Sequence, residues 1–412
     1  MTKSPQELYQ ERELRVGEAI ACRKPDRVPV LGIFGSLAAA YGGVTMREEQ
    51  YDLGKALEAV LKATIDFELD MATAALSVGP VLEALDYKQL KWAGHGLPDN
   101  VSYQFVEDEY MKADEYDALI YDPTDFITRI YWPRAFGKLG VFAQLGSLRD
   151  IICYYMGVMN FLPFATPAGL EALEALKKAA EESMKALGTL MSYFEKVRGL
   201  GFPLLFGATT QAPFDTLGDF FRGTKGVMLD MYRRPDKVLA ATEKLLPWML
   251  RNAVDTAKTV RNPRVFIPLH KGPEGFMSLE QFKRFYWPTL RDLLVGLVNE
   301  GLNPIVLVEG GYTSRLDIIA DVPERKIVYW FEDVDMGKAR EVLGGKVCIM
   351  GNVPMSLLVG GTTDQVREYC RKTIDMAGRD GGYIMSAAAV MDGARPENVR
   401  AMVDATREYG VY

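Results

Sequence analysis

The alternation of short apolar runs with helical patterns in the C-terminal part of the chain constrains the fold most. After Arg264, runs rich in β-branched and aromatic residues occupy 265–269, 305–308, 327–331, 347–350 and 383–385. Helical patterns separate them; Ser278 and Gln281 form a capping-box pattern that predicts a helix to about Glu300. Thr362 or Thr363 is expected to begin another helix, and Pro396 the last one. Strands separated by single helices predict parallel βαβ units.

The same alternation of apolar runs and helical patterns is present, less regularly, before Arg264. We expect strands over 28–34 and 204–206, and helices over 53–69, 166–197 and 237–259. Residues 1–26 are predicted to be an N-terminal extension, and the acidic, turn-rich stretch at about 87–140 an insertion over one end. The sequence therefore predicts an α/β protein, a single (β/α)8 TIM barrel domain over 1–412 with an elaborated N-terminal half. A doubly wound sheet is the alternative, but no GxGxxG or GxxxxGK[ST] motif follows a predicted strand.

Composition excludes several classes of partner. With 48 basic and 55 acidic residues the formal net charge is -7, and no Lys/Arg run could track a phosphate backbone, so we expect no nucleic acid partner. The N-terminus is charged, and the uncharged stretch 151–170 is interrupted by Asn160, Pro163 and Pro167, so no membrane segment is expected. The four cysteines are scattered without CxxC spacing. These features predict a cytoplasmic protein.

Candidate functional residues lie where the predicted strands end, because the active sites of such barrels form at the carboxyl ends of the strands. The prediction assigns catalysis to His270, Glu309 and Asp333, and substrate binding to Asp70, Asn352, Ser386 and Tyr312. His270 and Glu309 could also be metal ligands. The structural alternatives are that His270 only bonds a neighbouring loop and that Asp333 and Asp335 cap the next helix. Tyr154, Tyr155 and Phe161 are candidates for an apolar lid.

Four segments carry a family resemblance. They are FMSLEQFKRFYWPTL (276–290), CIMGNVP (348–354), LLVGGTTDQV (357–366) and GGYIMSAAAV followed by RPENVRAM (381–402). In these the chain resembles the uroporphyrinogen decarboxylase superfamily. The resemblance implies a single (β/α)8 barrel, a homodimer, and one of two activities: tetrapyrrole decarboxylation, or zinc-dependent methyl transfer with corrinoid proteins.

Departures from the family pattern indicate which branch fits. The decarboxylases carry an Arg-rich segment after the first strand, which a ligand with eight carboxylates requires, whereas residues 32–44 here are small, apolar and uncharged. The His of the decarboxylases near the last strand aligns with Ala389. The His-x-Cys zinc ligands of the coenzyme-M-activating methyltransferases align with Leu307, Val308 and Glu309, and their last Cys also aligns with Ala389. The chain thus resembles instead a longer, corrinoid-dependent O-demethylase branch.

The resemblance and these departures lead to one functional expectation and two alternatives. We expect a methyltransferase that moves a methyl group from a methoxylated small molecule, for example a phenyl methyl ether, to the Co(I) corrinoid of a partner protein. A zinc ion held by oxygen and nitrogen ligands is the candidate cofactor. The alternatives are a decarboxylase or lyase acting on a small carboxylated substrate, with Lys271 or Arg315 pointing inward, and a non-catalytic ligand-binding or scaffold protein.

Overall fold

The computed structural model describes residues 3–75, 79–147 and 157–412. Tyr154, Tyr155 and residues 151–156 of the uncharged stretch lie outside the described residues. Within the described ranges, no helix is both long enough and apolar enough to cross a membrane.

A parallel sheet forms the centre of the molecule. Six strands lie side by side in chain order, all parallel: β4 (Ala208–Thr209), β5 (Arg264–Leu269), β6 (Asn303–Gly311), β7 (Val328–Asp333), β8 (Cys348–Gly351) and β9 (Tyr383–Ile384). Each occupies or adjoins a run predicted to be a strand, because those runs are apolar enough to be buried on both faces.

Two further segments close this sheet into a ring. The segment around Val30 pairs in parallel with Met385, directly beyond β9, and the amide of Asp70 donates to the carbonyl of Val30 (3.0 Å). The segment around Ala72 pairs in parallel with Leu204, just ahead of β4. Eight segments therefore surround one interior, and the predicted (β/α)8 barrel is confirmed.

The helices around and beyond the ring fall into two groups. The N-terminal half contains α1 (Pro5–Ile20), α2 (Ser36–Gly42), α3 (Met46–Tyr51), α4 (Leu53–Asp66), α5 (Gly79–Leu85), α6 (Tyr116–Tyr121), α7 (Pro123–Phe126), α8 (Trp132–Ala135) and α10 (Pro167–Gly199). The C-terminal half contains α11 (Pro213–Thr216), α12 (Gly223–Arg233), α13 (Pro235–Val260), α14 (Leu279–Gln281), α15 (Trp287–Asn299), α16 (Leu316–Ile319), α17 (Met336–Leu343), α18 (Met355–Gly360), α19 (Thr363–Thr373) and α20 (Pro396–Tyr409). Short π-helical or 3-10 segments adjoin several of them, including the π-helical η5 (Leu217–Arg222) after α11 and η6 (Phe282–Tyr286) after α14.

Local sequence signals fix where several helices begin. Ser278 and Thr362 each accept from the backbone three residues on, and the glutamine at that position bonds back, so both predicted capping boxes are present. Pro396 occupies the first turn of α20. The predicted helix over 166–197 is observed as α10.

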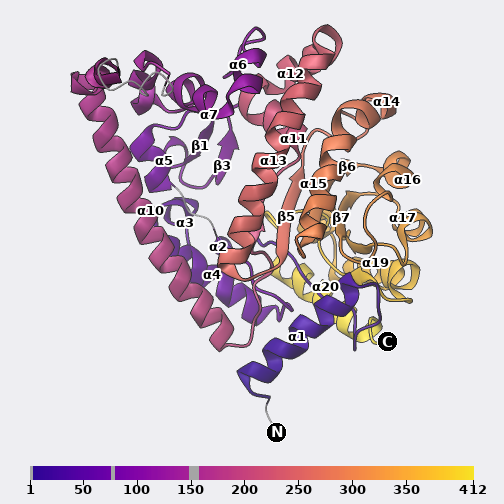
Figure 1. Cartoon of the computed structure of the whole chain (residues 1–412). Helices are drawn as coiled ribbons and strands as arrows, with labels where there is room; N and C mark the ends of the chain where they lie inside the picture. The colour runs from indigo at the N-terminus through magenta and orange to yellow at the C-terminus, as the bar shows by residue number, and fades with distance from the viewer. Residues whose placement is uncertain (1–2, 76–78, 148–156) are drawn as a thin grey trace.

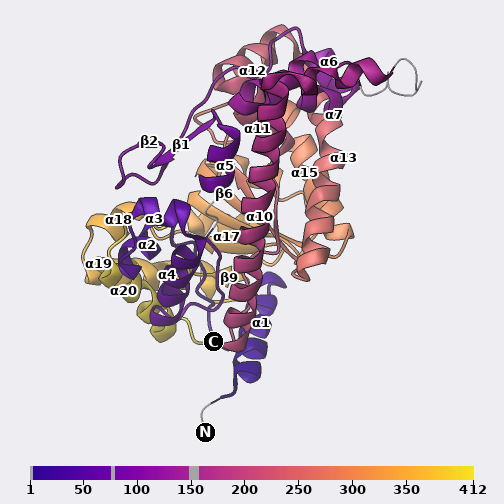
Figure 2. The same cartoon turned by 90° about the vertical axis from the view of Figure 1, so that its left-hand side faces the viewer.

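The interior of the ring is apolar and is closed at one end by α1. Leu31, Met71, Leu307 and Trp330 from different strands belong to the same buried cluster as Val16 of α1, which covers the amino ends of the strands. Arg264, the first residue of β5, makes an ion pair with Glu13 of α1 (2.8 Å), which places that helix at the same end. The carboxyl ends of the strands therefore face away from α1, towards the end of the molecule where α6, α7 and α12 lie (Figures 1 and 2).

The elaborated N-terminal half lies beside and above the ring. A small sheet with the strand order β2 (Gly96–Leu97), β1 (Leu90–Ala93), β3 (Tyr103–Phe105) precedes the short helices α6 to α8. The long helix α10 runs along one side of the molecule, past these elements and past α4, towards α1 (Figures 1 and 2). The N-terminal half therefore supplies side chains over one part of the barrel mouth.

Candidate active site

His270 and Asp219 form a close pair at the mouth of the barrel. His270 follows β5 directly, and its Nδ1 lies 2.6 Å from Oδ2 of Asp219 on η5. The His270 side chain is 33% exposed, and its Nε2 has no hydrogen-bond partner among the described residues. Burial alone would lower the pKa of His270, but the hydrogen bond and charge of Asp219, with the charges of Asp215 and Glu309, raise it to about 9. The ring is therefore an imidazolium at neutral pH, with one N–H directed to Asp219 and the other available at the mouth.

Asp215 fixes the backbone on which His270 sits. Its two carboxylate oxygens accept from the amides of His270 (3.0 Å) and Lys271 (2.9 Å), and Tyr286 donates its hydroxyl to Oδ2 (2.7 Å). Asp215 is completely buried, and burial together with the charge of Asp219 raises its pKa to about 6. A carboxylate with three donors in this position holds the end of β5 rigidly.

Lys271 is buried at the mouth, but its charge is balanced. Its ammonium lies 2.9 Å from Oδ1 of Asp219 and 3.5 Å from Glu107, and donates to Oγ1 of Thr224 (2.8 Å). Burial would raise the pKa of Asp219, but the hydrogen bond of His270 and the charge of Lys271 lower it. Asp219 thus remains a carboxylate between two cations, and Lys271 has no spare charge for a ligand.

Glu309 is a second candidate at the mouth, in β6. Its carboxylate has no hydrogen-bond partner among the described residues, and burial raises its pKa against the opposing charge of His270. The neighbouring Glu332 of β7 accepts from the amide of Gly310 (2.7 Å) and its charge adds to the rise. Both catalytic candidates, His270 and Glu309, are therefore within electrostatic reach of one another.

Asp333 lies apart from this pair. It ends β7 as an exposed residue, and its charge acts on Tyr369 rather than on His270 or Glu309. The alternation of side chains along a strand turns consecutive residues to opposite sides, so Glu332 and not Asp333 approaches Glu309. Helix α17 is capped by Asp335, which accepts from Lys338.

The remaining predicted residues near the mouth have structural contacts. Asn352 is buried, donates to the carbonyl of Val334 (3.0 Å) and accepts from the hydroxyl of Tyr369 (2.9 Å). Ser386 is fully buried beyond β9, and its hydroxyl has no partner among the described residues.

Tyr312 packs behind the cluster that contains Asp215. It is fully buried, and its ring meets Phe282 edge-on with centroids 5.9 Å apart. A β-carbon on Gly272 would come within 1.8 Å of the Tyr312 hydroxyl and 2.9 Å of the Tyr286 ring. Gly272 therefore allows both tyrosines to pack under the chain just after Lys271.

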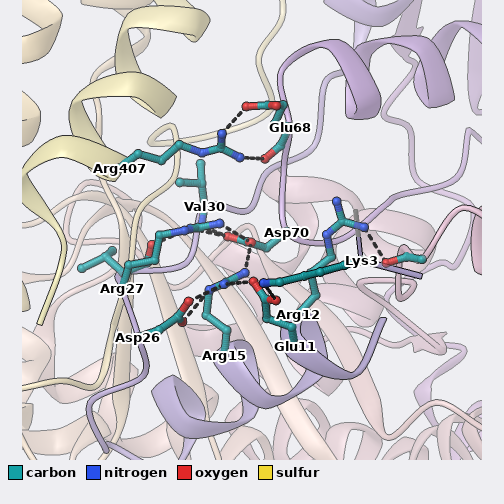
Figure 3. A network of polar contacts seen from close by, with 12 residues as sticks. Lys3, Glu11, Arg12, Arg15, Asp26, Arg27, Val30, Glu68, Asp70 and Arg407 are labelled. Atoms are coloured by element: carbon teal, nitrogen blue, oxygen red, sulfur yellow. Dashed lines mark hydrogen bonds and ion pairs between the residues drawn. The ribbon is translucent and has the colours of Figure 1, made fainter. Parts of the chain in front are cut away.

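Asp70 is not at the mouth. It accepts from Arg15 (2.8 Å), Arg27 (2.7 Å) and the amide of Val30 (2.8 Å), and its side chain is 2% exposed (Figure 3). Arg15 belongs to α1, which covers the amino ends of the strands. Asp70 begins its strand segment instead of ending it, so the sequence placed this carboxylate at the wrong end of the barrel.

The donor set does not match a zinc centre. In the described part of the chain, no group of three or more His, Cys, Asp or Glu residues is arranged to hold a metal ion. Nδ1 of His270 is already occupied by Asp219. Structural and catalytic zinc sites use at least three protein ligands, so His270 and Glu309 alone do not complete the zinc site that the sequence led us to expect.

The sequence analysis missed Asp215 and Asp219. They lie four residues apart on consecutive helical turns directly after β4, and so on one side of the chain. Two aspartates with this spacing behind a strand end were the available signal. Tyr286 was not identifiable, because it lies inside an apolar helical pattern.

Fold and site together define a class: a (β/α)8 barrel protein with a buried cluster of acidic and basic groups at the carboxyl ends of its strands. The family model described as Uroporphyrinogen decarboxylase (URO-D) matches residues 158–409. The chain belongs to this family.

Individual relatives are distant. The chain is 28% identical over 130 residues to a uroporphyrinogen decarboxylase of Syntrophotalea carbinolica, covering 32% of this chain and 37% of the relative. It is 26% identical over 271 residues to that of Francisella philomiragia subsp. philomiragia, covering 61% and 76%. A solved structure, a methyltransferase from Methanosarcina mazei, superposes with a TM-score of 0.66 at 16% identity, covering 97% of this chain and 98% of that one. This last likeness supports the barrel fold.

Proposed function

We propose that this protein is a methyltransferase that moves a methyl group from a methoxylated small molecule to the Co(I) corrinoid of a partner protein. The observation that carries the proposal is the His270–Asp219 pair, which presents a protonated imidazole at the mouth of the barrel. The methyltransferase with the same fold supports the general class of reaction.

The chemistry explains why one positioned acid suffices. The partner's Co(I) corrinoid supplies the nucleophile that accepts the methyl group. As the C–O bond of the ether breaks, its electron pair stays on oxygen, and Nε2–H of His270 donates the proton that neutralises the oxygen. Asp219 orients the ring and stabilises its charge, and Asp215 holds the backbone beneath it.

Glu309 would position the methyl donor and the proton of a hydrogen bond to its hydroxyl group. Its carboxylate has no hydrogen-bond partner among the described residues and lies within reach of the charge of His270. With a raised pKa it can accept from, or donate to, a hydroxyl group of the substrate. The corrinoid protein would dock on the open mouth, because the methyl carbon must be reached from outside the barrel.

The alternative of a decarboxylase finds less support. That reaction needs a cation facing the carboxylate of the substrate. Lys271 is neutralised by Asp219 and Glu107, while Arg315 is buried with its guanidinium 4.7 Å from the Phe282 ring centroid. A non-catalytic scaffold is disfavoured by the raised pKa values of His270 and Asp215, since perturbed groups gather at functional sites.

The test is an anaerobic transfer assay. The protein would be mixed with Co(I) cobalamin or a competent corrinoid protein and a panel of methoxylated aromatic compounds, and transfer followed by the absorbance of the corrinoid. We expect transfer with the wild type, a fall of at least 100-fold in His270→Ala, and wild-type rates in His95→Ala. His95, the second histidine, stacks on Trp92 (4.2 Å) and serves as the matched control. Transfer that survives His270→Ala would contradict the assignment of the acid, and no transfer from any donor would contradict the proposed function.

A further inference from the structure

A cavity of about 340 Å³ lies at the mouth, across the carboxyl ends of a different set of strand segments from those that carry His270. Its floor is formed by the segment that follows Val30 and by the residues after Ala72, and β3 lies over it. Phe34 and Val60 give it apolar walls, and Tyr103 of β3 contributes a phenol. This volume and lining are typical of a site for one small molecule.

The charges of this cavity are all negative. Glu49 and Asp392 line it, and no Lys, Arg or His occurs among its described lining residues. Burial and the charge of Asp392 raise the pKa of Glu49 to about 7, so the half-buried Glu49 lies within electrostatic reach of the exposed Asp392. A ligand with its own carboxylate would meet repulsion from these two carboxyl groups, and none of the described lining residues would offer it a cation.

Asp392 is held in place by its neighbours. Its Oδ1 accepts from the amide of Ser36 (2.7 Å). A β-carbon on Gly35, which has φ +54°, would come within 2.4 Å of the same oxygen, so the chain can approach this closely only with glycine. The position of the carboxylate in the cavity is therefore fixed by the backbone and is not a matter of side-chain freedom.

Tyr103 relates the cavity to Glu309. Burial and the charges of Asp392 and Glu309 raise the pKa of Tyr103, so its ring lies within reach of the carboxylate in the cavity and of the one beside His270. A ligand that extends from Glu49 and Asp392 past Tyr103 would therefore have its far end near Glu309, the carboxylate whose charge acts on His270.

We propose that this cavity binds the methyl donor, and that it selects neutral or cationic methoxylated compounds with a hydroxyl or amino group and rejects carboxylated ones. The inference rests on the proposed function only for the identity of the ligand as a methyl donor. The hydroxyl or amino end would bond to Glu49 and Asp392, and the aromatic ring would lie between Phe34 and Tyr103. The methoxy group would then face His270.

Three probes of nearly equal size test this selection: para-methoxybenzylamine, para-methoxybenzyl alcohol and para-methoxybenzoate. Binding to the full chain is measured by calorimetry without any corrinoid protein, so the result does not depend on catalysis. We expect the amine to bind at least about tenfold more tightly than the benzoate, with the alcohol between them, because the carboxyl groups of the cavity attract an ammonium group and repel a carboxylate. Benzoate binding as tight as that of the amine, or no binding of any probe, would overturn the proposal.

Variants locate the selection. Glu49→Gln and Asp392→Asn keep the shape and hydrogen-bonding capacity of each side chain, and each should weaken the amine about tenfold while improving the benzoate. Asp404→Asn, an exposed carboxylate of α20 outside the cavity, is the matched control and should change neither affinity. If Asp392→Asn does not fold, Glu49→Gln and the wild-type probe series still test the assignment of the cavity. Unchanged selectivity in a folded Glu49→Gln variant would contradict that assignment.

The two proposals can fail separately. Selection of the amine over the benzoate without methyl transfer would refute the proposed function alone. Methyl transfer from para-methoxybenzoate at the rate of the amine would refute the cavity assignment alone.

Discussion

Asp219→Asn is the most informative single change, because it removes one charge and leaves the shape of the site unchanged. Asp219 lies 2.6 Å from Nδ1 of His270 and is the main group that opposes the effect of burial on that ring. With asparagine at this position the largest opposing contribution is lost and only the charges of Asp215 and Glu309 still offset burial, so the pKa of His270 should fall from about 9 towards the ordinary 6.5. At neutral pH the variant would then have a neutral imidazole where the wild type has an imidazolium.

The magnitude follows from the pKa itself. The pKa of His270, about 9, lies about 2.5 above the ordinary value of 6.5. Because a pKa difference of one corresponds to about 1.36 kcal/mol, the folded protein favours the charged ring by about 3 kcal/mol. The side chain is 33% exposed, so solvent screening reduces the expected contribution to about 2 kcal/mol. Because the folded pKa of His270 lies above its unfolded value, this stabilisation is complete below pH 6.5 and is lost as the pH rises through 9.

Nuclear magnetic resonance can follow this titration directly, because the chain contains only two histidines. With carbon-13-labelled histidine, His95→Asn identifies the signal of His270. We expect the wild-type signal to titrate near pH 9 and that of Asp219→Asn at a clearly lower pH, towards 6.5. The signal of Asp255→Asn, a change at an exposed aspartate of α13, should titrate as in the wild type. The difference in the free energy of unfolding between wild type and Asp219→Asn should also shrink by about 2 kcal/mol as the pH rises from 6.5 through 9. A wild-type His270 that titrates at 6.5 or lower would refute both the charge assignment and the role of His270 as the acid.

Three further predictions concern stability and metal dependence. Asp70→Ala leaves the buried Arg15 and the half-buried Arg27 without their shared carboxylate, and should lower the free energy of unfolding by about 3 kcal/mol in urea titrations, with Asp255→Ala as a control. Gly272→Ala places a carbon 1.8 Å from the hydroxyl of Tyr312, and the resulting strain should cost about 1–3 kcal/mol; an unchanged melting temperature would contradict the packing described. Dialysis against a chelator should leave methyl transfer at its starting rate, since the described residues form no group of three or more metal ligands; loss of transfer with recovery on adding zinc would contradict this.

Most of the barrel could be predicted because its determinants are local. An apolar run such as 305–308 is long enough for one buried strand, and Ser278 with Gln281 begins the following helix through bonds within four residues. The first segments were harder to delimit: the described pairings around Val30 and Ala72 are single bridges, so the ring there is held by a few hydrogen bonds and carries no long strand pattern. The small sheet with β1 to β3 depends on pairing across turns that the sequence did not specify.

The site could be predicted only where strand ends determine it. His270 and Glu309 follow from the rule that chemistry gathers at the carboxyl ends of barrel strands. Asp70 shows the limit of that rule, because a carboxylate near a strand is informative only when it is known which end of the strand it occupies. Asp219 lies on a helical turn that reaches His270 only in the folded chain, so the sequence alone could not determine the protonation state of the imidazole.

The distribution of charge across the mouth gives the proposed reaction a direction. His270 offers an N–H at the end of β5, beside Asp219 and Glu309, whereas the charged groups of the described cavity lining are only the carboxyl groups of Glu49 and Asp392. An ether oxygen gains negative charge as its methyl group leaves, and the imidazolium stabilises that charge while the carboxyl groups would oppose it. A donor with a hydroxyl or amino group at one end and a methoxy group at the other is therefore favoured in a single orientation, with the breaking C–O bond at His270. The same asymmetry works against a polycarboxylated tetrapyrrole, because the described lining of the cavity has no cation to receive it.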